Sequence, residues 1–386
     1  MIKLSIMADL HLRATEPYDG KNSSRLDEKL GALGAMVNNA ITDNHEMIIL
    51  AGDTFDSQDP PEWLRAKFID ALDPCFCQDL RVYILVGNHE TNGQKTAFDS
   101  LVSLQNALHG SRDWPLRIIT EPTIVKYDKV IFNLVPYCKP EAAIEAVTSC
   151  PDVDNKSKIL VGHFDVDGAQ ASGGNSFKIP TILRRHHFDG YVMSFLGHIH
   201  QRQVHLTADR LGFWTYVGSP VYQDFGERDD TSPKGYYEVT VDDDGDVEYT
   251  DIPIVSTEFT QVEATEETLS SIKENGTTSP VQELRRALKG KICKVVFIGT
   301  EDFLKSSLVQ KYRLRFRKLE QDGYAVKVIC DTRCTDRQII NQEESAPEAE
   351  GLDVSMEFLC KERDAEAFLA EGRTYLEAAH NAVAKS

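Results

Sequence analysis

The chain has 386 residues, of which 41% are hydrophobic and 27% are charged, and its formal net charge is −19. This composition is ordinary for a globular protein of roughly two or three domains, and so acidic a surface argues against nucleic-acid binding unless basic groups or metal ions act locally. No apolar run approaches the ~20 residues of a membrane-spanning helix and no signal peptide is evident, so we expect a cytoplasmic protein without a membrane partner.

Short apolar runs alternate with helical patterns in the first part of the chain. The buried strands that we predict are Lys3–Met7, Met47–Leu50, Val82–Val86, Ile159–Val161 and Tyr191–Leu196. The helical patterns cover Ser24–Ile41, Glu62–Leu72 and Gln94–Leu108, and Ser24 with Asp27 suggests a capping box at the first of them. This alternation predicts a layered α/β domain.

The second part of the chain begins with a predicted hairpin, Tyr236–Val241 and Val247–Ile254, whose Asp244-Gly245 pair suits a tight turn. Composition changes after about Ser256. A smaller unit is predicted there, with helices at Val281–Lys289 and Asp302–Gln321 and strands at Ile292–Ile298 and Ala325–Cys330. Asn341–Asp353 is rich in Glu, Ala and Pro, as flexible linkers are, and Met356–Ala384 is predicted to be helical. The predicted divisions are therefore 1–255, 256–340, 341–354 and 355–386.

Polar residues of one chemical type follow most of the predicted strands. These motifs are Asp9-Leu-His11, Gly52-Asp53, Gly87-Asn-His-Glu90, Gly162-His163 and Gly197-His-Ile-His200. Functional groups of open α/β sheets collect outside the carboxyl ends of the strands, so we expect the motifs to converge. Their glycines are expected to give conformational freedom where the chain turns sharply.

The motifs supply three carboxylate or amide oxygen donors and five of the 11 histidines, with no thiolate. This mixed set favours manganese or iron over structural zinc. So many ligands suit two metals about 3.5–4 Å apart with one bridging carboxylate, for which Asp53 is the natural candidate. A single histidine is more often a surface or satisfied core group, but chance rarely places five of them directly after strands.

The five motifs resemble those of the calcineurin-like metallophosphoesterases. The resemblance implies a two-sheet β-sandwich flanked by helices. It also implies one metal held by Asp9, His11, Asp53 and His200, and another held by Asp53, Asn88, His163 and His198. A water molecule would then attack phosphorus, with His89 as the catalytic residue that protonates the leaving oxygen or stabilises the phosphoryl charge.

Two further stretches resemble the bacterial and phage SbcD-type nuclease subunits of DNA double-strand-break repair complexes. They are Ala51–Asp56 followed by Pro60-Pro61, and Tyr216–Pro220 followed by Phe225-Gly-Glu227 and Lys234-Gly-Tyr236. The resemblance implies an exonuclease and endonuclease with two Mn²⁺ ions, replaceable by Mg²⁺ or Fe²⁺. It also implies a small α/β capping domain, a homodimer, and a coiled-coil SbcC-type ATPase bound by the C-terminal helices. Archaeal and eukaryotic relatives often carry His where Asp56 stands. The sequence therefore leaves open how the DNA end is rotated for exonucleolytic cutting.

Two basic clusters are candidates for contact with DNA phosphates, although each is also explained as a solvated face. The first is Arg184 with Arg185, and the second includes Lys311, Arg313 and Arg317 on a helix of the smaller unit. The net acidity instead favours a phosphatase or a cyclic-nucleotide phosphodiesterase of the same superfamily. The complete set of ligands argues against a non-enzymatic scaffold that bridges DNA ends.

Overall fold

A computed structural model of the chain describes residues 1–21, 24–92, 95–99, 101–102, 115–127, 129–153, 156–170, 183–270 and 288–335. The chain divides into two compact units, one of residues 1–298 and 305–333 and the other of residues 299–304 and 334–386. The divisions drawn from composition at residues 255, 340 and 354 stay predictions.

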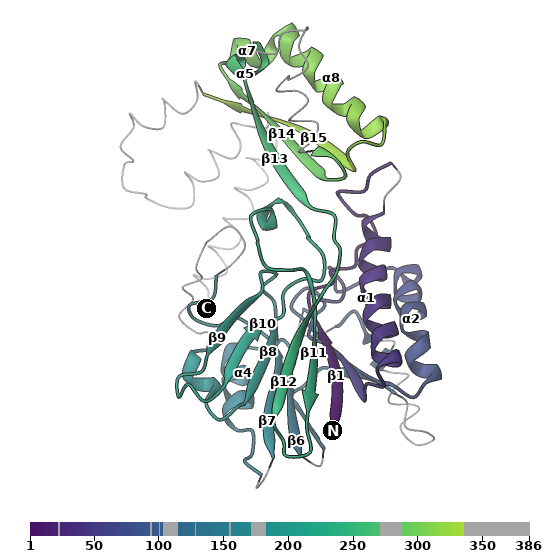
Figure 1. The fold of residues 1–386 in the computed structure, drawn as a ribbon, viewed down its shortest axis with the longest axis vertical. Helices are drawn as coiled ribbons and strands as arrows, with labels where there is room; N and C mark the ends of the chain where they lie inside the picture. The colour runs from purple at the N-terminus through teal and green to yellow at the C-terminus, as the bar shows by residue number, and fades with distance from the viewer. Residues whose placement is uncertain are drawn as a thin grey trace, which may run out of the picture. The chain divides into compact units, whose positions relative to one another are not determined.

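Two six-stranded sheets form the main body of the first unit (Figure 1). The first sheet has the order β12-β11-β1-β2-β3-β4, with bounds Val247–Pro253, Gly235–Val241, Ile2–Met7, Met47–Leu50, Arg81–Leu85 and Leu116–Ile119. The second has the order β5-β6-β7-β8-β10-β9, with bounds Thr123–Lys126, Val130–Val135, Ser157–His163, Met193–Gly197, Phe213–Tyr216 and Gln203–Leu206. The predicted α/β fold class with two sheets is confirmed.

The central strands of both sheets are parallel, so their carboxyl ends meet at a common edge. β1 runs parallel to β2, and β7 runs parallel to β8. One core cluster lies between the sheets and includes Leu4, Ile49, Phe132 and Phe195. A strand that is covered on both faces needs apolar side chains at every position, not at alternate positions. This is why the sequence of β2 is Met-Ile-Ile-Leu.

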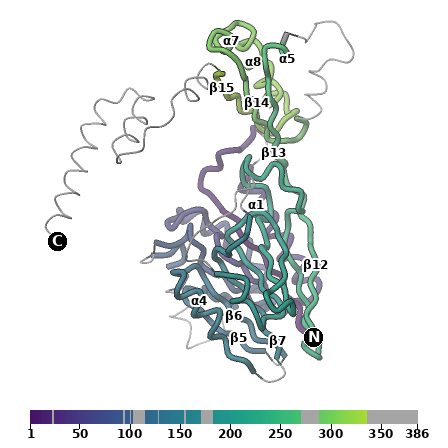
Figure 2. The backbone as a smooth tube through the Cα atoms, turned by 90° about the vertical axis from the view of Figure 1, so that its left-hand side faces the viewer, coloured from purple at the N-terminus to yellow at the C-terminus, as the bar shows by residue number. Residues whose placement is uncertain are grey.

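Helices cover the outer face of each sheet. α1 (Arg25–Thr42) and α2 (Glu62–Cys77) lie beside each other along the first sheet (Figure 1). α4 (Pro140–Thr148) and the short η1 (Arg185–Phe188) pack on the second sheet, where Figure 2 shows α4 beside β6. The predicted cap is present, since the side chain of Ser24 accepts a hydrogen bond from the backbone N–H of Asp27.

α2 extends five residues beyond the predicted end at Leu72, with Pro74 inside it. Proline removes one helical hydrogen bond, and its ring crowds the preceding turn. The core compensates, because Cys75 is fully buried and belongs to the same cluster as Leu72. The expected end of this helix was therefore wrong, and tertiary packing is the reason.

The smaller sheet has the order β13-β14-β15, with bounds Phe259–Thr265, Ile292–Gly299 and Lys327–Cys334. β13 lies in a stretch for which no strand was predicted, and the short α5 (Glu266–Ser270) follows it. The helix expected over Asp302–Gln321 is two helices, α7 (Glu301–Lys305) and α8 (Ser307–Gln321). Ser306 divides them because its side chain caps α8 by accepting a hydrogen bond from the N–H of Val309.

Some of the predicted segments lie wholly or mostly outside the described residues. They are the helices Gln94–Leu108 and Val281–Lys289, the linker 341–354 and the C-terminal helical segment 355–386. Among the helices that the structure does describe, none has both the length and the hydrophobicity to cross a membrane.

Candidate metal centre

The loops that follow β1 and β2 run beside each other at the carboxyl edge of the first sheet. The backbone N–H of Asp9 donates to the carbonyl of Gly52 over 3.1 Å, and that of His11 donates to the carbonyl of Asp53 over 2.9 Å. The side chains of Asp9 and Asp53 are almost wholly buried. Parallel pairing of the strands therefore places two carboxylates together, as the sequence predicted.

Four of the predicted ligands have a backbone conformation that residues other than glycine rarely adopt. Their φ angles are 56° at Asp9, 47° at His11, 49° at Asp53 and 95° at His198. Such a conformation costs of order 1–3 kcal/mol at each residue and persists only where the surrounding structure enforces it. Strain concentrated on these residues marks the edge of the sheet as a functional site.

Glycines beside the ligands allow the loops to approach one another closely. A Cβ atom at Gly52 would lie 2.1 Å from His163 Nδ1, and one at Gly87 would lie 2.1 Å from Asp53 Oδ1. Of these two glycines only Gly52 has a positive φ, of 94°. The expectation of conformational freedom therefore holds at Gly52, whereas Gly87 is required because no side chain fits there.

A first cluster consists of Asp9, His11 and His200, whose ligand atoms all lie within 4.8 Å of one another. The Nε2 atoms of His11 and His200 are 2.9 Å apart. Neighbouring ligands of an octahedral cation with bonds of ~2.1 Å lie about 3 Å apart, so this spacing suits two imidazoles on one ion. Asp9 Oδ2 is buried without a hydrogen-bond partner in the described structure, which leaves it available to a cation.

A second cluster consists of Asp53, His163 and His198, again with ligand atoms within 4.8 Å of one another. The side-chain oxygen of Asn88 lies beside it, 2.9 Å from His163 Nε2 and 2.8 Å from His198 Nδ1. Asn88 thus adds an amide oxygen to a carboxylate and two imidazoles. This is the mixed donor set that suits a divalent transition metal.

Asp53 joins the two clusters. Its Oδ2 atom lies 3.3 Å from His163 Nε2 and 3.7 Å from His11 Nε2, and its Oδ1 accepts a hydrogen bond from the backbone N–H of His89. Burial raises the pKa of Asp53, but His163 and His11 outweigh that effect and hold it below its usual range. All seven predicted ligands therefore meet at one place, and the donor set fits a pair of divalent cations. Their role as ligands stays a prediction.

His89 lies at the rim of the two clusters with its side chain 43% exposed. Its Nδ1 is 3.3 Å from Asp56 Oδ1, and its ring meets that of His11 edge to face at 4.7 Å. The hydrogen bond to Asp56 raises the pKa of His89. The same carboxylate lies 2.9 Å from His11 Nδ1, so Asp56 orients a predicted ligand and the predicted proton donor together.

Three of the ligand histidines have an oxygen atom close to the ring nitrogen that faces away from their cluster, in a hydrogen bond at His200 and His163 and in an ion pair at His198. Glu227 Oε1 lies 2.8 Å from His200 Nδ1, Asp165 Oδ1 lies 2.9 Å from His198 Nε2, and the carbonyl of Ala51 lies 2.9 Å from His163 Nδ1. Such acceptors fix the tautomer, so that the other nitrogen presents its lone pair to a metal. Glu227 and Asp165 were not predicted as functional residues, although Glu227 belongs to the Phe225-Gly-Glu227 stretch noted in the sequence.

Glu90 holds the loops of the second and third strands together. Its fully buried carboxylate accepts hydrogen bonds from the backbone N–H groups of Phe55 over 2.9 Å and Gly87 over 2.8 Å. Burial raises the pKa of Glu90 to about 8. Glu90 therefore supports the positions of Asp53 and Asn88 through the backbone.

We expect Glu227→Gln to weaken metal binding by about 10–100-fold, which is typical of the loss of a group that orients a ligand. Lys234 Nζ lies 2.6 Å from Glu227 Oε2, and both side chains are buried. The variant removes one of the two carboxylates that face this buried ammonium and leaves it with Asp230 and two uncharged acceptors, so we also expect about 3 kcal/mol of lost stability. Metal titration and chemical denaturation measure the two effects. Glu248→Gln, on the exposed face of β12, is the matched control, and equal behaviour of the two variants would contradict the role of Glu227.

The residues predicted to contact DNA lie outside both clusters. Arg184 and Arg185 are exposed at the start of η1. Lys311 and Arg317 are exposed on α8, whereas Arg313 is half-buried with its guanidinium 5.6 Å from the centre of the Phe297 ring. Arg313 therefore packs on its own sheet, a contact that the sequence pattern did not show.

Comparisons with known proteins agree with this geometry at the level of the family. Residues 2–202 match the profile of the calcineurin-like phosphoesterases. A dimetal phosphatase from Danio rerio aligns with 12% identity over 62% of this chain and 92% of its own, with a TM-score of 0.40. The nuclease MPE of Pseudomonas putida aligns with 16% identity over 45% of this chain and 66% of its own, with a TM-score of 0.23. No curated protein sequence matches significantly.

Proposed function

Because the chain belongs to the calcineurin-like phosphoesterase family and carries grouped metal-ligand side chains, it is a metal-dependent hydrolase, and we propose that its substrate is DNA. The proposed activity is manganese-dependent exonuclease and endonuclease cleavage of phosphodiesters at DNA ends, as in SbcD-type nucleases. The observation that carries the proposal is Asp53 Oδ2, which lies between His11 and His163 and is placed to bridge two cations. Two bound cations would supply positive charge to a phosphate that becomes more negative during attack by water.

The residues of the chain have distinct tasks in this reaction. Asp9, His11 and His200 would hold one cation, while Asn88, His163 and His198 would hold the other, with Asp53 shared. We propose Mn²⁺ at both positions, with Mg²⁺ or Fe²⁺ as substitutes, because the donors are imidazole, carboxylate and amide groups.

His89 is the residue best placed to protonate the leaving oxygen. Its side chain is partly exposed beside His11 of the first cluster, and its Nδ1 atom is paired with Asp56 Oδ1 over 3.3 Å. The unperturbed pKa of histidine lies near neutral pH, so a modest rise favours the protonated form as the proton donor.

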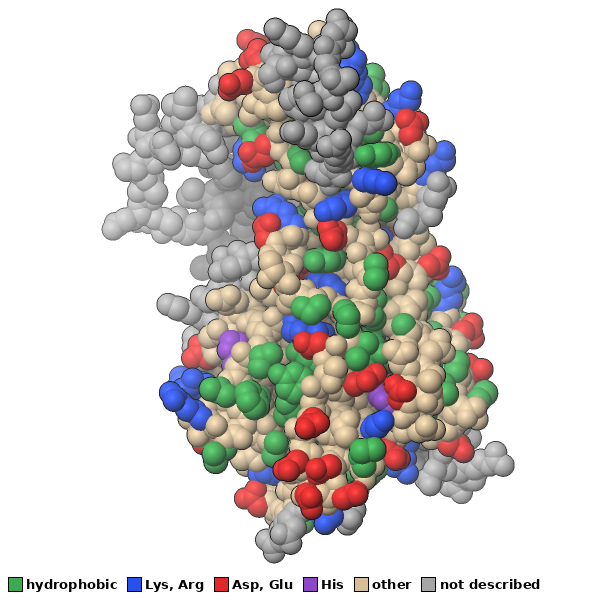
Figure 3. Space-filling view, in the orientation of Figure 1, with side chains coloured by type: hydrophobic (Ala, Val, Ile, Leu, Met, Phe, Trp, Pro, Cys, Tyr) green, Lys and Arg blue, Asp and Glu red, His purple; other side chains and the backbone are tan. Residues whose placement is uncertain are grey.

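Part of the acidic charge is concentrated at one hairpin. Figure 3 shows acidic side chains gathered near the tip of the β11–β12 hairpin, where Asp242, Asp243, Asp244 and Asp246 are exposed. Ile2 pairs with Val241 next to this tip, whereas Asp9 follows the opposite end of β1. Six strand residues at ~3.3 Å each separate the two ends by about 20 Å, roughly two Debye lengths at physiological salt. The acidic tip therefore repels DNA only weakly at the metal centre.

Cleavage of two substrates separates the proposal from its nearest rival. The rival is a phosphatase or cyclic-nucleotide phosphodiesterase, which the net charge of −19 favours. We expect the protein with Mn²⁺ to degrade end-labelled duplex and hairpin DNA and to hydrolyse a phosphomonoester slowly. Fast hydrolysis of p-nitrophenyl phosphate without cleavage of DNA would establish a phosphatase instead.

Charge reversal on α8 tests the proposed contact with DNA phosphates. Arg317→Glu combined with Lys318→Glu is the suitable variant because both side chains are exposed, whereas reversal of Arg313 would disturb its packing on Phe297. We expect weaker binding to DNA of every sequence, and a salt slope that falls by about 1 for each phosphate that is no longer neutralised. Lys126→Glu combined with Lys139→Glu, at two exposed lysines outside α8, makes the same change in net charge and is the control. Unchanged affinity and slope would exclude α8 from the DNA surface.

We further propose a homodimer and an SbcC-type ATPase partner with a coiled coil, both in the cytoplasm. The sequence lacks a Gly-x-x-x-x-Gly-Lys-Ser/Thr motif, so dependence on ATP would come from the partner. The segment proposed to bind it, residues 355–386, lies outside the described structure. Co-purification of the ATPase with the full chain, but not with a chain lacking residues 356–386, would support this assignment.

A further inference from the structure

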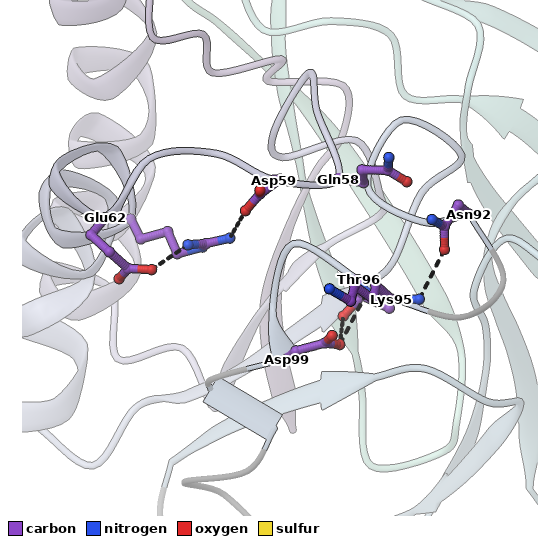
Figure 4. A pocket seen from close by; sticks show the side chains of 8 residues that line it. Gln58, Asp59, Glu62, Asn92, Lys95, Thr96 and Asp99 are labelled. Atoms are coloured by element: carbon purple, nitrogen blue, oxygen red, sulfur yellow. Dashed lines mark hydrogen bonds and ion pairs between the residues drawn. The ribbon is translucent and has the colours of Figure 1, made fainter.

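A polar pocket of about 500 Å³ lies between two loops that leave the metal centre (Figure 4). Its walls include the side chains of Gln58, Asp59, Glu62, Arg65, Asn92 and Thr96. None of these residues belongs to the groups of metal-ligand side chains found in the described structure. The reaction proposed above does not use the pocket.

The chain connects this pocket directly to the catalytic groups. Gln58 follows Asp56 by two residues, and Asn92 follows His89 by three residues. Consecutive Cα atoms are 3.8 Å apart, so the Cα atom of Gln58 lies at most about 8 Å from that of Asp56, and the Cα atom of Asn92 lies at most about 11 Å from that of His89. The pocket therefore lies close to His89, the residue that would protonate the leaving oxygen.

The walls of the pocket are held in place by packing beneath them. The rings of Phe55, Phe68 and Phe98 meet at centroid distances of 5.3–6.5 Å. They join the segment after β2, which carries Phe55, to α2 and to the segment after β3, which carries Phe98. Arg65 Nε donates a hydrogen bond of 2.9 Å to the carbonyl of Ala97. A binding site formed in advance loses less entropy when a ligand binds.

The chemistry of the walls selects the kind of ligand. The guanidinium of Arg65 is paired with Glu62 and, over 3.3 Å, with Asp59. Lys95 and Asp99 also line the pocket, so three carboxylates stand against two cations and the lining carries no excess of positive charge for a phosphate. Amide, hydroxyl and carboxylate groups instead suit a neutral ligand with several hydrogen-bond donors and acceptors, which are properties of a nucleobase and its sugar.

We propose that this pocket binds the nucleoside on the leaving-group side of the scissile phosphodiester. The inference rests on the proposed nuclease function and gives that function a subsite. It predicts that a substrate with a nucleoside leaving group gains binding energy that a simple aryl diester does not.

Substitution of Gln58 tests the subsite, because this side chain is exposed in the loop and the variants are expected to fold. Gln58→Ala removes one hydrogen-bonding group, and Gln58→Trp fills part of the pocket. With Mn²⁺, we expect kcat/KM on a thymidine oligonucleotide to fall about 3–10-fold in the first variant and at least about 10-fold in the second. Neither variant should change kcat/KM on bis(p-nitrophenyl) phosphate. Gln78→Ala and Gln78→Trp, at the exposed end of α2, are the matched controls.

The outcomes distinguish the two proposals. If the wild-type protein cleaves the oligonucleotide and both Gln58 variants do so at its rate, the subsite is wrong and the nuclease function stands. If the variants lose activity equally on both substrates, Gln58 supports the metal centre and the subsite is again wrong. A wild-type protein that hydrolyses only the aryl diester would overturn the nuclease function and the subsite together.

Discussion

Replacement of Asp53 by asparagine is expected to abolish paired metal binding and to lower kcat/KM on DNA by at least about 1,000-fold. The amide keeps the size of the side chain but removes the negative charge that would be shared by two cations. Metal ions contribute several kcal/mol of charge stabilisation in the transition state, and each ~1.4 kcal/mol corresponds to a factor of ten in rate. Elemental analysis after dialysis against Mn²⁺ gives the metal content, and digestion of end-labelled DNA gives the rate.

The matched control is Asp70→Asn, which makes the same chemical change on the exposed face of α2. This control should bind two metals and cut DNA at the wild-type rate. If Asp53→Asn also kept two metals per chain, Asp53 Oδ2 would not be a bridging ligand. If it lost one metal and retained full activity, a single cation would suffice and the two-cluster interpretation would fail.

The positions of the predicted ligands followed from the sequence because each motif lies at the carboxyl end of a buried strand or just after it. The apolar runs that form β1, β2, β3, β7 and β8 are recognisable locally. Parallel pairing aligns the carboxyl ends of β1, β2 and β3 in the first sheet and those of β7 and β8 in the second, and the packing of the two sheets brings these ends together. The order of the strands was not needed for this inference. The convergence of Asp9 and Asp53 was therefore predictable from the pattern of residues alone, whereas that of His163 with them also needed the two-sheet sandwich that the family resemblance implies.

The groups that orient the ligands were not predictable in the same way. Asp165 and Glu227 are acidic residues in loops, and their sequence neighbourhood does not show which histidine each one contacts. Glu227 meets His200 across 27 positions, and Ala51 meets His163 across 112 positions. Such pairs depend on how loops fold back, as does β13, whose pairing with β14 overrides a polar local sequence.

His89→Asn is expected to slow cleavage of DNA by about 100–10,000-fold while both metals stay bound, because it removes a proton donor and no metal ligand. A nucleoside leaves as an alkoxide that needs a proton, whereas nitrophenolate leaves without one. The variant should therefore hydrolyse bis(p-nitrophenyl) phosphate at close to the wild-type rate. Rates on the two substrates, with metal content measured on the same samples, give the comparison.

The pH profile provides a second test of the same role. Asp56 raises the pKa of His89, so the protonated donor persists to higher pH than for a free histidine and is lost as the pH rises through that raised pKa. The wild-type rate on DNA should therefore decline on the alkaline side, and this decline should be absent from the residual activity of His89→Asn. His186→Asn, an exposed histidine on η1, should leave both the rate and the profile unchanged. A variant of His89 that lost activity equally on both substrates would show that this imidazole stabilises the charged phosphoryl group, since that contact is made whichever group leaves.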